Sequence, residues 1–437
     1  MKQTSDPSYE SADETAGQQT GPGGNPEVLR DPGIPLAEFI TIIAIIMALN
    51  ALAIDVMLPA LPAIGDALNI VRENDRHLIL VSYLFGFGGA QLFFGPIADS
   101  LGRRTVLVGG LALYSVASVA AIFTQDLNQL LLARVFQGVG CAGARVAALS
   151  VVRDCYTGRR MGKMMSLVMM VFMSVPVIAP AIGQAILLVS GWRWIFTMLL
   201  VSGCIMLVWS ALRLPETLAR ENRRPIELAK ISEAYRTALT TRACLGYAVG
   251  TAFIFGGLFA FLAMSQQVFV DVFDLGRMFP LVFASIAVSM AVASFTNAQL
   301  VEALGMRRLS HAALIVYTVF GFAIFAFSAL GHENLWVFFI LVTIVMTCFG
   351  FVGANFNAMA MEPLGKIAGT AASVIGFIST AGGAFLGYVM GQLYDGSTAP
   401  LGLAFTAYGL IAIGFVLFAE RGRMFHALER NDPASKV

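Results

Sequence analysis

The chain has 437 residues, of which 57% are hydrophobic and only 13% are charged. Soluble globular domains carry roughly 25% charged residues, so this composition excludes an ordinary soluble enzyme and indicates a membrane protein. The net charge of +1 carries little information, and we expect a lipid bilayer rather than a nucleic acid as the surrounding partner.

Apolar stretches of about twenty residues recur along the chain, each long enough to cross about 30 Å of hydrocarbon as a helix. Membrane-spanning strands would alternate polar and apolar residues, and these stretches do not. We therefore predict an all-α membrane protein with twelve transmembrane helices, near residues 37–60, 77–97, 104–124, 128–152, 163–189, 194–214, 244–269, 278–299, 309–330, 334–358, 367–392 and 400–420.

The distribution of lysine and arginine predicts the orientation. With the N-terminus in the cytoplasm, the inner loops and C-terminal tail hold twenty of these residues and the outer loops hold four. This is a strong positive-inside bias, and an even number of spans places both termini in the cytoplasm. Residues 1–35 lack apolar periodicity, so we expect a disordered cytoplasmic tail without a cleaved signal peptide.

The polar stretch 215–243 divides the spans into two sets of six, and the second set repeats the first. A shift of 203 residues places Asp99 on Glu302, Gly102 on Gly305 and Arg104 on Arg307. Parallel repeats of this kind occur in transporters, with the substrate site between the halves. We predict a bundle over 36–214, a cytoplasmic linker over 215–243, a second bundle over 244–420 and a cytoplasmic tail over 421–437.

Neither a metal site nor an enzyme active site is indicated. The five cysteines are scattered without metal-type spacing, and the four histidines lie near span ends or in the tail. No nucleophile–base pair or phosphate-binding loop is present. We therefore expect no enzyme activity and no cofactor, with the proton gradient as the energy source.

Asp55 lies within the first predicted span, just before Pro59 and Pro62. Membrane-embedded acids are costly and usually face a cavity or a partner. A proton carrier is one interpretation. The other is an acid close to the outer interface, where the prolines end the helix.

Arg134 and Arg145 both lie in the fourth span. They are eleven residues apart, which amounts to three turns plus about 20°, so they share one face, and we expect that face to line the central cavity. Arg134 matches Asp55 in depth, and we hypothesise that the two form a proton-sensitive pair. Arg145 lies deeper, where it either binds an anionic substrate group or reaches backbone carbonyls or the interface.

Other polar side chains within the spans either line the same cavity or join neighbouring helices. The candidate substrate-binding residues, in addition to Arg145, are Asn50, Tyr83, Gln91, Gln137, Asn355 and Asn357.

Two segments are candidates for a conformational gate. The short loop between the second and third spans contains Gly95, Asp99, Gly102, Arg103 and Arg104. Glycine permits a tight turn there, and Asp99 either pairs with Arg103 or faces a helix N-terminus. In the fifth span, Pro176 and Pro180 bend the helix and Gly183 permits close packing.

Together these residues resemble the twelve-span drug:proton antiporters of the major facilitator superfamily, and among them the Bcr/CflA-type exporters. The resemblance covers roughly residues 36–420 and is most specific in the loop from Gly95 to Arg104. It implies the major facilitator fold in two pseudo-symmetric halves, and a role for Arg134 in proton coupling. Pro180 and Gly183 resemble the antiporter motif of span five, although Ala179 and Gln184 depart from it.

The resemblance implies proton-coupled export of a small molecule, a drug or a metabolite, across the bacterial cytoplasmic membrane. The departures from the family pattern, with Arg145 among them, favour a narrower or anionic substrate. A monomer is the default expectation. Proton-coupled uptake on the same fold is the alternative. A receptor or scaffold that does not transport is a second alternative, which the charged residues Asp55, Arg134 and Arg145 disfavour.

Overall fold

The computed structural model describes residues 33–223 and 225–425. Twelve helices in these ranges are long and apolar enough to cross a membrane, which confirms the predicted number of spans. Most of the two predicted tails, residues 1–32 and 426–437, lies outside the described residues.

The first six spans consist of long helices with three short helical segments at the ends of the first and second. The long helices are α1 (Leu36–Asp55), α3 (Leu78–Leu101), α4 (Arg103–Ile122), α5 (Leu127–Cys155), α6 (Gly158–Val189) and α7 (Arg193–Arg213). The short ones are η1 (Leu58–Ala60), α2 (Leu61–Ala67) and η2 (Glu73–His77).

The last six spans follow the same order, with more interruptions. They comprise α9 (Arg242–Gln267), η4 (Val268–Val272), η5 (Gly276–Met278), α10 (Phe279–Leu304), α11 (Met306–Ala329), α12 (Leu335–Met361), η6 (Glu362–Ile367), α13 (Ala368–Phe377), η7 (Ile378–Gly382), α14 (Gly383–Gln392) and α15 (Ala399–Ala419). Segments η4 and η7 are π-helical turns, a form that often occurs at functional sites.

The polar linker is more ordered than its composition predicts. It contains η3 (Arg220–Asn222) and the amphipathic helix α8 (Leu228–Thr240). The Tyr235 hydroxyl of α8 donates a hydrogen bond to the Leu92 carbonyl of α3, and burial raises the pKa of Tyr235 above its usual value. Helix α8 also contacts α13, so the linker touches both sets of spans.

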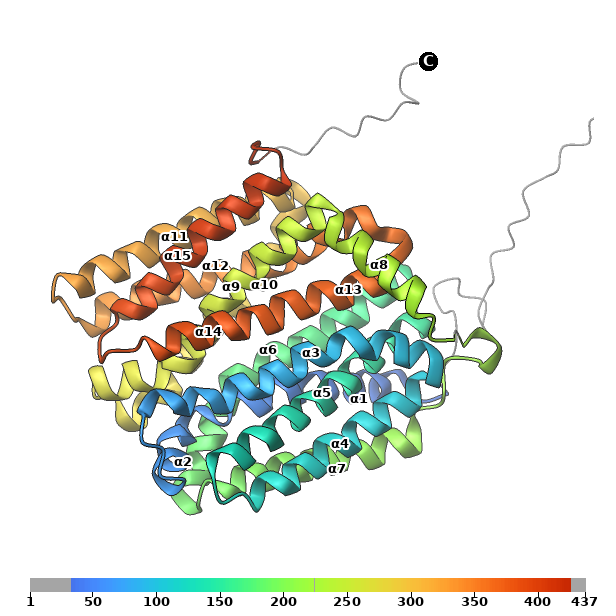
Figure 1. Cartoon of the computed structure of the whole chain (residues 1–437), viewed down its shortest axis with the longest axis horizontal. Coiled ribbons are helices and arrows are strands. Elements are labelled where there is room, and N and C mark those ends of the chain that lie inside the picture. Colours follow the sequence, from blue (N-terminus) through green and yellow to red (C-terminus); the bar gives the residue numbers. More distant parts are fainter. Residues whose placement is uncertain (1–32, 224, 426–437) are drawn as a thin grey trace, which may run out of the picture.

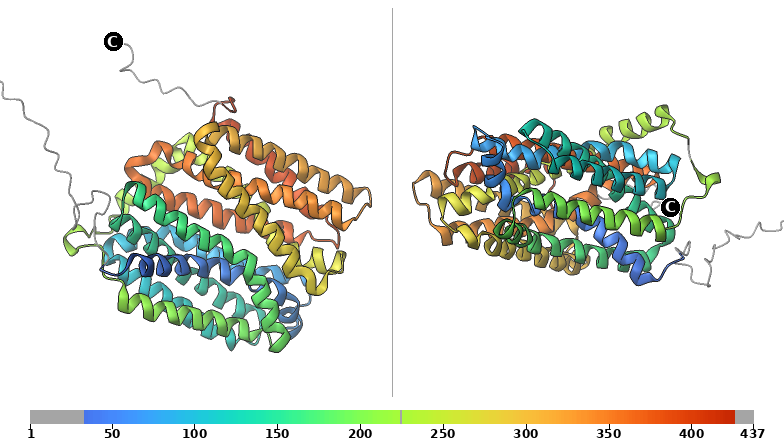
Figure 2. Two further views of the ribbon diagram at one scale, coloured as in Figure 1. Left: turned by 180° about the vertical axis from the view of Figure 1, so that it is seen from behind. Right: turned by 90° about the horizontal axis from the view of Figure 1, so that it is seen from below.

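Each set of six spans forms one bundle, and the two bundles lie side by side (Figure 1). The largest contacts between them are those of α3 with α13, η7 and α14 on one face and of α6 with α10 on the other. The short segments η1 and η2 also contact α9 and α14. The pair α6 and α10 is visible from behind in Figure 2.

Small residues allow the backbones to approach closely where helices cross. A side chain on Gly86 of α3 would collide with the Val135 carbonyl of α5, and one on Gly138 of α5 would collide with the Tyr83 carbonyl. Gly88 faces the backbone of Ala381 in η7. Helix packing of this kind relies on van der Waals contact, because lipid is as apolar as the helix surfaces.

The predicted repeat is present in the backbone. Gly102, between α3 and α4, has φ 105° and ψ 149°, and Gly305, between α10 and α11, has φ 82° and ψ 148°. Residues with a side chain rarely adopt such positive φ values. Both halves therefore use a glycine for the same tight turn after their second span.

Candidate functional site: the interface between the two halves

The two ends of the molecule differ in how the halves are joined. We call the end with the Gly102 turn the Gly102 end, and the end with α2 and η2 the α2 end. Among the described residues, hydrogen bonds between one half and the other occur only at the α2 end, and no ion pair joins the halves.

The contact at the α2 end, which we call the latch, is formed by Asn74 and His77 of η2, Gln267 of α9 and Gln392 of α14. The Asn74 amide donates to the carbonyls of Gln392 and Tyr394 at 3.2 and 3.0 Å, and the Gln392 amide donates to the Asn74 carbonyl at 2.9 Å. The latch therefore ties the start of the second span to the eleventh span.

His77 extends the latch to the seventh span. Its Nε2 lies 2.7 Å from Oε1 of Gln267, and because that oxygen only accepts, Nε2 carries the proton. His77 is 1% exposed. The position opposite is Gly391, where a side chain would come within 2.7 Å of Nδ1. Close packing and hydrogen bonding together close the α2 end.

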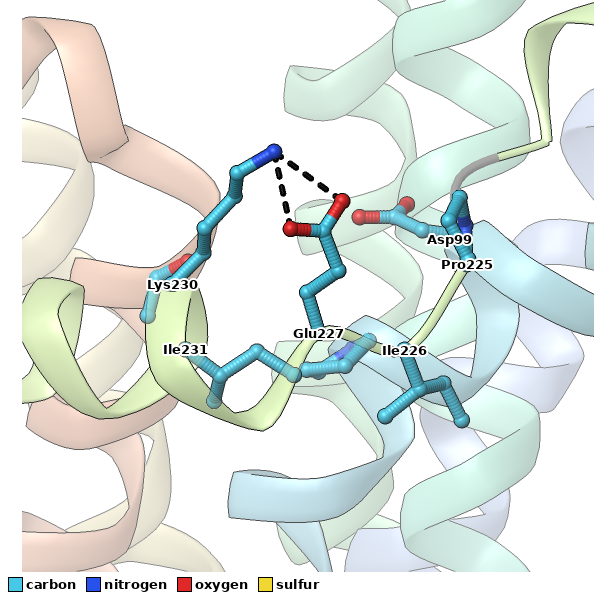
Figure 3. Close-up of a pocket in the computed structure, with 8 residues that line it drawn as sticks. Asp99, Pro225, Ile226, Glu227, Lys230 and Ile231 are labelled. Carbon is cyan, nitrogen blue, oxygen red and sulfur yellow. Dashed lines mark hydrogen bonds and ion pairs between the residues drawn. The ribbon is translucent and has the colours of Figure 1, made fainter.

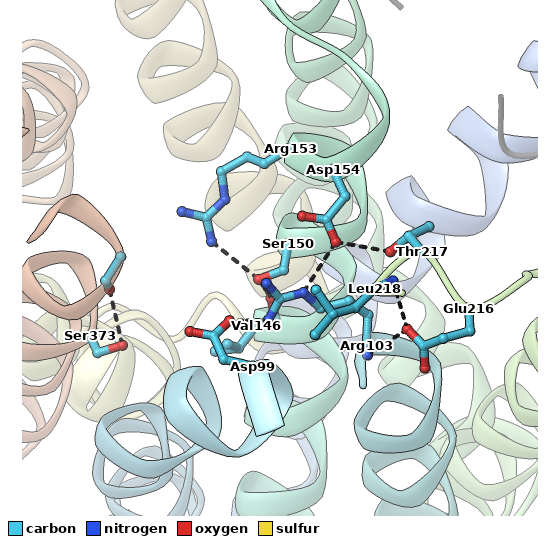
Figure 4. Close-up of polar contacts among 11 residues, drawn as sticks. Asp99, Arg103, Val146, Ser150, Arg153, Asp154, Glu216, Thr217, Leu218 and Ser373 are labelled. Atoms are coloured by element: carbon cyan, nitrogen blue, oxygen red, sulfur yellow. Dashed lines mark hydrogen bonds and ion pairs between the residues drawn. The ribbon is translucent and has the colours of Figure 1, made fainter. Parts of the chain in front are cut away.

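At the Gly102 end, polar contacts stay within one half or its linker. Arg103 forms an ion pair with Asp99 and donates from Nε to Asp154 at 3.2 Å (Figure 4). The Arg103 backbone N–H donates to Glu216 at 2.9 Å, and Thr217 donates to Asp154. Of the two partners expected for Asp99, Arg103 is the one observed, and the cluster fastens the Gly102 turn to the start of the linker.

The second half has a matching cluster. Arg307 donates from Nε to Glu420 at 2.7 Å and from Nη2 to Glu362 at 3.2 Å. In both halves an arginine after the second span thus binds an acid near the end of the fourth span. A second acid, after the sixth span, also joins each cluster.

A cavity of about 410 Å³ opens at the Gly102 end (Figure 3). It lies between Pro96 and Asp99 of α3, Thr370 of α13 and the linker residues from Pro225 to Ile231. The Lys230 ammonium pairs with Glu227 at 2.9 Å on its wall. Five of the eight residues that line it belong to the linker, so the cavity lies beneath the linker, beside the contact between α3 and α13.

Asp55 is the last residue of α1 and is 4% exposed. Gly183 of α6 packs nearby, against the carbonyl of Val56 and the ring of Pro59. Within the described residues the Asp55 carboxylate has no hydrogen bond or ion pair. An ionisable residue within a membrane span is costly and usually has a functional role.

Arg134 does not pair with Asp55 in this structure, contrary to the hypothesis. The fully buried guanidinium donates to the Ala53 carbonyl at 3.0 Å, the Ile79 carbonyl at 3.1 Å and Gln137 at 2.6 Å. It also lies 4.4 Å from the centre of the Tyr83 ring. Arg134 joins α1, α3 and α5 in a closed interface and does not line a cavity.

Arg145 shares the face of Arg134, as predicted, because both guanidinium groups lie over rings of α3. Arg145 lies 5.4 Å from the centre of the Phe87 ring and is only partly buried. Its Nε atom is buried without a hydrogen-bond partner. The contrast with Arg134, which satisfies its donors on the protein, is the main electrostatic feature of this interface.

Most other polar candidates form contacts between helices. Tyr83 donates to Asn50 at 3.2 Å, Gln137 donates to Ser118 at 2.8 Å, and Asn355 donates to Asn297 at 2.8 Å. Asn357 is exposed on α12. Gln91 differs from all of them, because its amide nitrogen is buried without a partner and its oxygen lies against Gly376 of α13.

The remaining gate candidates lie where the helices meet. Pro176 and Pro180 are inside α6, and Pro180 is buried. Gly95 lies close to Ser373 of α13, at the boundary between the halves. The latch residues were not predicted as a gate, because a single glutamine or asparagine at a span end carries no distinctive pattern in the sequence.

Two six-helix bundles of repeated topology, joined by a latch at one end and by a linker with a cavity beneath it at the other, define a multi-pass membrane protein of the transporter type. The model of the Major Facilitator Superfamily matches residues 43–387. The chain belongs to this superfamily.

Curated relatives cover most of the chain. It is 28% identical over 364 residues to the bicyclomycin resistance protein homolog of Haemophilus influenzae, which covers 83% of this chain and 91% of the relative. It is 26% identical over 376 residues to multidrug resistance protein D of Escherichia coli, with coverage of 85% and 93%.

Solved structures share the fold at low identity. The human organic anion transporter MFSD10 superposes with a TM-score of 0.63 at 17% identity and covers 88% of this chain and 100% of its own. A D-xylose-proton symporter superposes with a TM-score of 0.68 at 14% identity, with coverage of 89% and 98%.

Proposed function

We propose that this protein exports a small molecule from the bacterial cytoplasm in exchange for protons. The observation that carries the proposal is Asp55, a buried carboxylate inside the membrane-spanning region without a partner among the described residues. The drug-resistance names of the relatives agree with export. The proton gradient is the energy source in this proposal, and no cofactor takes part.

The positive-inside bias supports a cytoplasmic Gly102 end, with both termini in the cytoplasm and the protein in the cytoplasmic membrane. The latched α2 end then faces the periplasm. In this orientation the cavity beneath the linker lies on the cytoplasmic side. We take the monomer as the working unit, because each chain contains both halves.

Asp55 exchanges its proton with the periplasm when the latch opens. Arg134 fixes the carbonyl of Ala53, two residues before Asp55, and thereby holds the end of α1 in place. Its part in coupling is to position the carboxylate rather than to pair with it. A proton that moves inward gains about 2.3 kcal/mol per 100 mV of membrane potential, which supports an outward substrate gradient.

An export screen tests the proposal. A pump-deficient bacterium that expresses the wild-type protein should accumulate less of at least one drug or metabolite than the empty host. Asp55→Asn should abolish that difference while protein abundance in the membrane stays unchanged. Asp66→Asn is the matched control, because Asp66 is exposed on α2 and lies 3.4 Å from Arg76. Full export by Asp55→Asn would refute the role of this carboxylate.

A further inference from the structure

Arg145 carries a charge that the protein does not neutralise. Among the described residues it has no ion pair and no hydrogen bond, and its contact is the face of Phe87. Its Nε donor is buried without an acceptor. A buried donor without an acceptor carries a desolvation cost, which an anion from outside the chain would offset.

Gln91 adds a second unused donor on the same side of α3. It lies four residues after Phe87, and residues at this spacing share one face of a helix. Its Nε2 atom is buried without an acceptor, whereas its Oε1 lies against Gly376 of the other half. Gln91 thus lies about one helical turn along α3 from Phe87, the residue whose ring faces the Arg145 guanidinium.

The nearby acids are already engaged. Asp154 lies nine residues beyond Arg145 on α5, about 13.5 Å along the helix axis, and binds Arg103 and Thr217. Asp99 lies beyond Gln91 on α3 and pairs with Arg103. Neither acid is available to Arg145, so the two donors face an interface that lacks a compensating protein carboxylate.

We propose that Arg145 and Gln91 form a subsite for a carboxylate group of the transported molecule. A guanidinium binds a carboxylate through two parallel N–H donors, the Gln91 amide supplies a further donor, and the Phe87 ring lies beneath the guanidinium. The substrate class is then a small organic carboxylate. This inference rests on the proposed transport function and names its substrate.

Direct binding tests the subsite without a proton gradient. The purified full-length protein is titrated calorimetrically with 1-naphthoate, benzoate and hexanoate and, in parallel, with the primary amide of each. At least one carboxylate should bind the wild type about tenfold more tightly than its amide, as expected for hydrogen bonds to a charged group. Arg145→Gln should bind the acid and the amide equally.

Three further variants separate recognition from folding. Arg145→Lys keeps the charge without the planar fork and should retain a weakened preference for carboxylates. Gln91→Leu should lower carboxylate affinity less than Arg145→Gln does. Arg277→Gln, at an exposed position of the α2 end, should match the wild type. Thermal unfolding of each variant reports whether it is folded.

The proposal is overturned if acid and amide bind the wild type equally, if none of the carboxylates binds, or if folded Arg145→Gln keeps the preference. Its failure is distinguishable from failure of the export proposal. Charge preference in binding requires no transport, whereas loss of export in Asp55→Asn requires no particular substrate charge.

Discussion

Gln267 is the residue whose removal should open the latch most directly. In Gln267→Leu, the buried Nε2–H of His77 loses its acceptor, which lies at 2.7 Å in the wild type. An unsatisfied buried donor costs about 1–3 kcal/mol. That cost falls only on the latched state, because water solvates His77 once the α2 end opens. The ratio of open to latched molecules should therefore rise roughly 5- to 150-fold.

Double electron–electron resonance spectroscopy measures this shift as a change in the distances between pairs of spin labels. The first pair of labels, at Val71 and Leu330, reports the distance between the halves at the α2 end. The second pair, at Leu101 and Leu304, reports it at the Gly102 end. All four positions are exposed. The variant should populate longer distances for the first pair and shorter distances for the second. Native Cys204, which is exposed, is replaced first.

Gln266→Leu is the matched control. Gln266 precedes Gln267 on α9 and is also buried, but the latch contacts do not include it. Its distance distributions should match those of the wild type. The reasoning is wrong if Gln267→Leu leaves both distributions unchanged, or if the control shifts them equally.

Two other substitutions follow from the backbone and from Arg134. Gly102→Ala should destabilise the protein by about 1–3 kcal/mol, because φ is 105° and the added carbon would displace Glu216. Gly109 has open space around it in α4, so the control Gly109→Ala should be neutral or stabilising in thermal unfolding. Equal effects of the two substitutions would contradict the role of the Gly102 turn. Arg134→Lys should lower the unfolding temperature and reduce export, because one ammonium group cannot reach the acceptors on α1, α3 and α5 together. A wild-type unfolding temperature in Arg134→Lys would show that the carbonyl contacts contribute little.

The sequence predicted the spans well because their signals are local. Length and apolarity identify each helix, and the glycine turns at Gly102 and Gly305 repeat at a fixed shift. Helix α8 was not predicted, because its amphipathic pattern lies within the charged stretch 215–243, which we interpreted as a linker. The shared face of Arg134 and Arg145 followed from helical geometry alone.

The partners of these side chains were beyond the sequence. We paired Asp55 with Arg134 because the two residues lie at a similar depth in their spans, but the guanidinium donates to the Ala53 carbonyl instead. Every residue has a backbone carbonyl, so the sequence does not indicate which of them accepts a hydrogen bond. The latch brings together Asn74, Gln267 and Gln392, which lie in different halves. Such pairings depend on how the bundles dock, and no local pattern encodes them.

Proton movement in proteoliposomes tests the central claim most directly. With a substrate identified by the export screen added outside, the wild type should acidify the medium as substrate enters and protons leave, and Asp55→Asn should not. Alkalinisation of the medium would indicate symport, and equal acidification by Asp55→Asn would contradict proton exchange at this carboxylate.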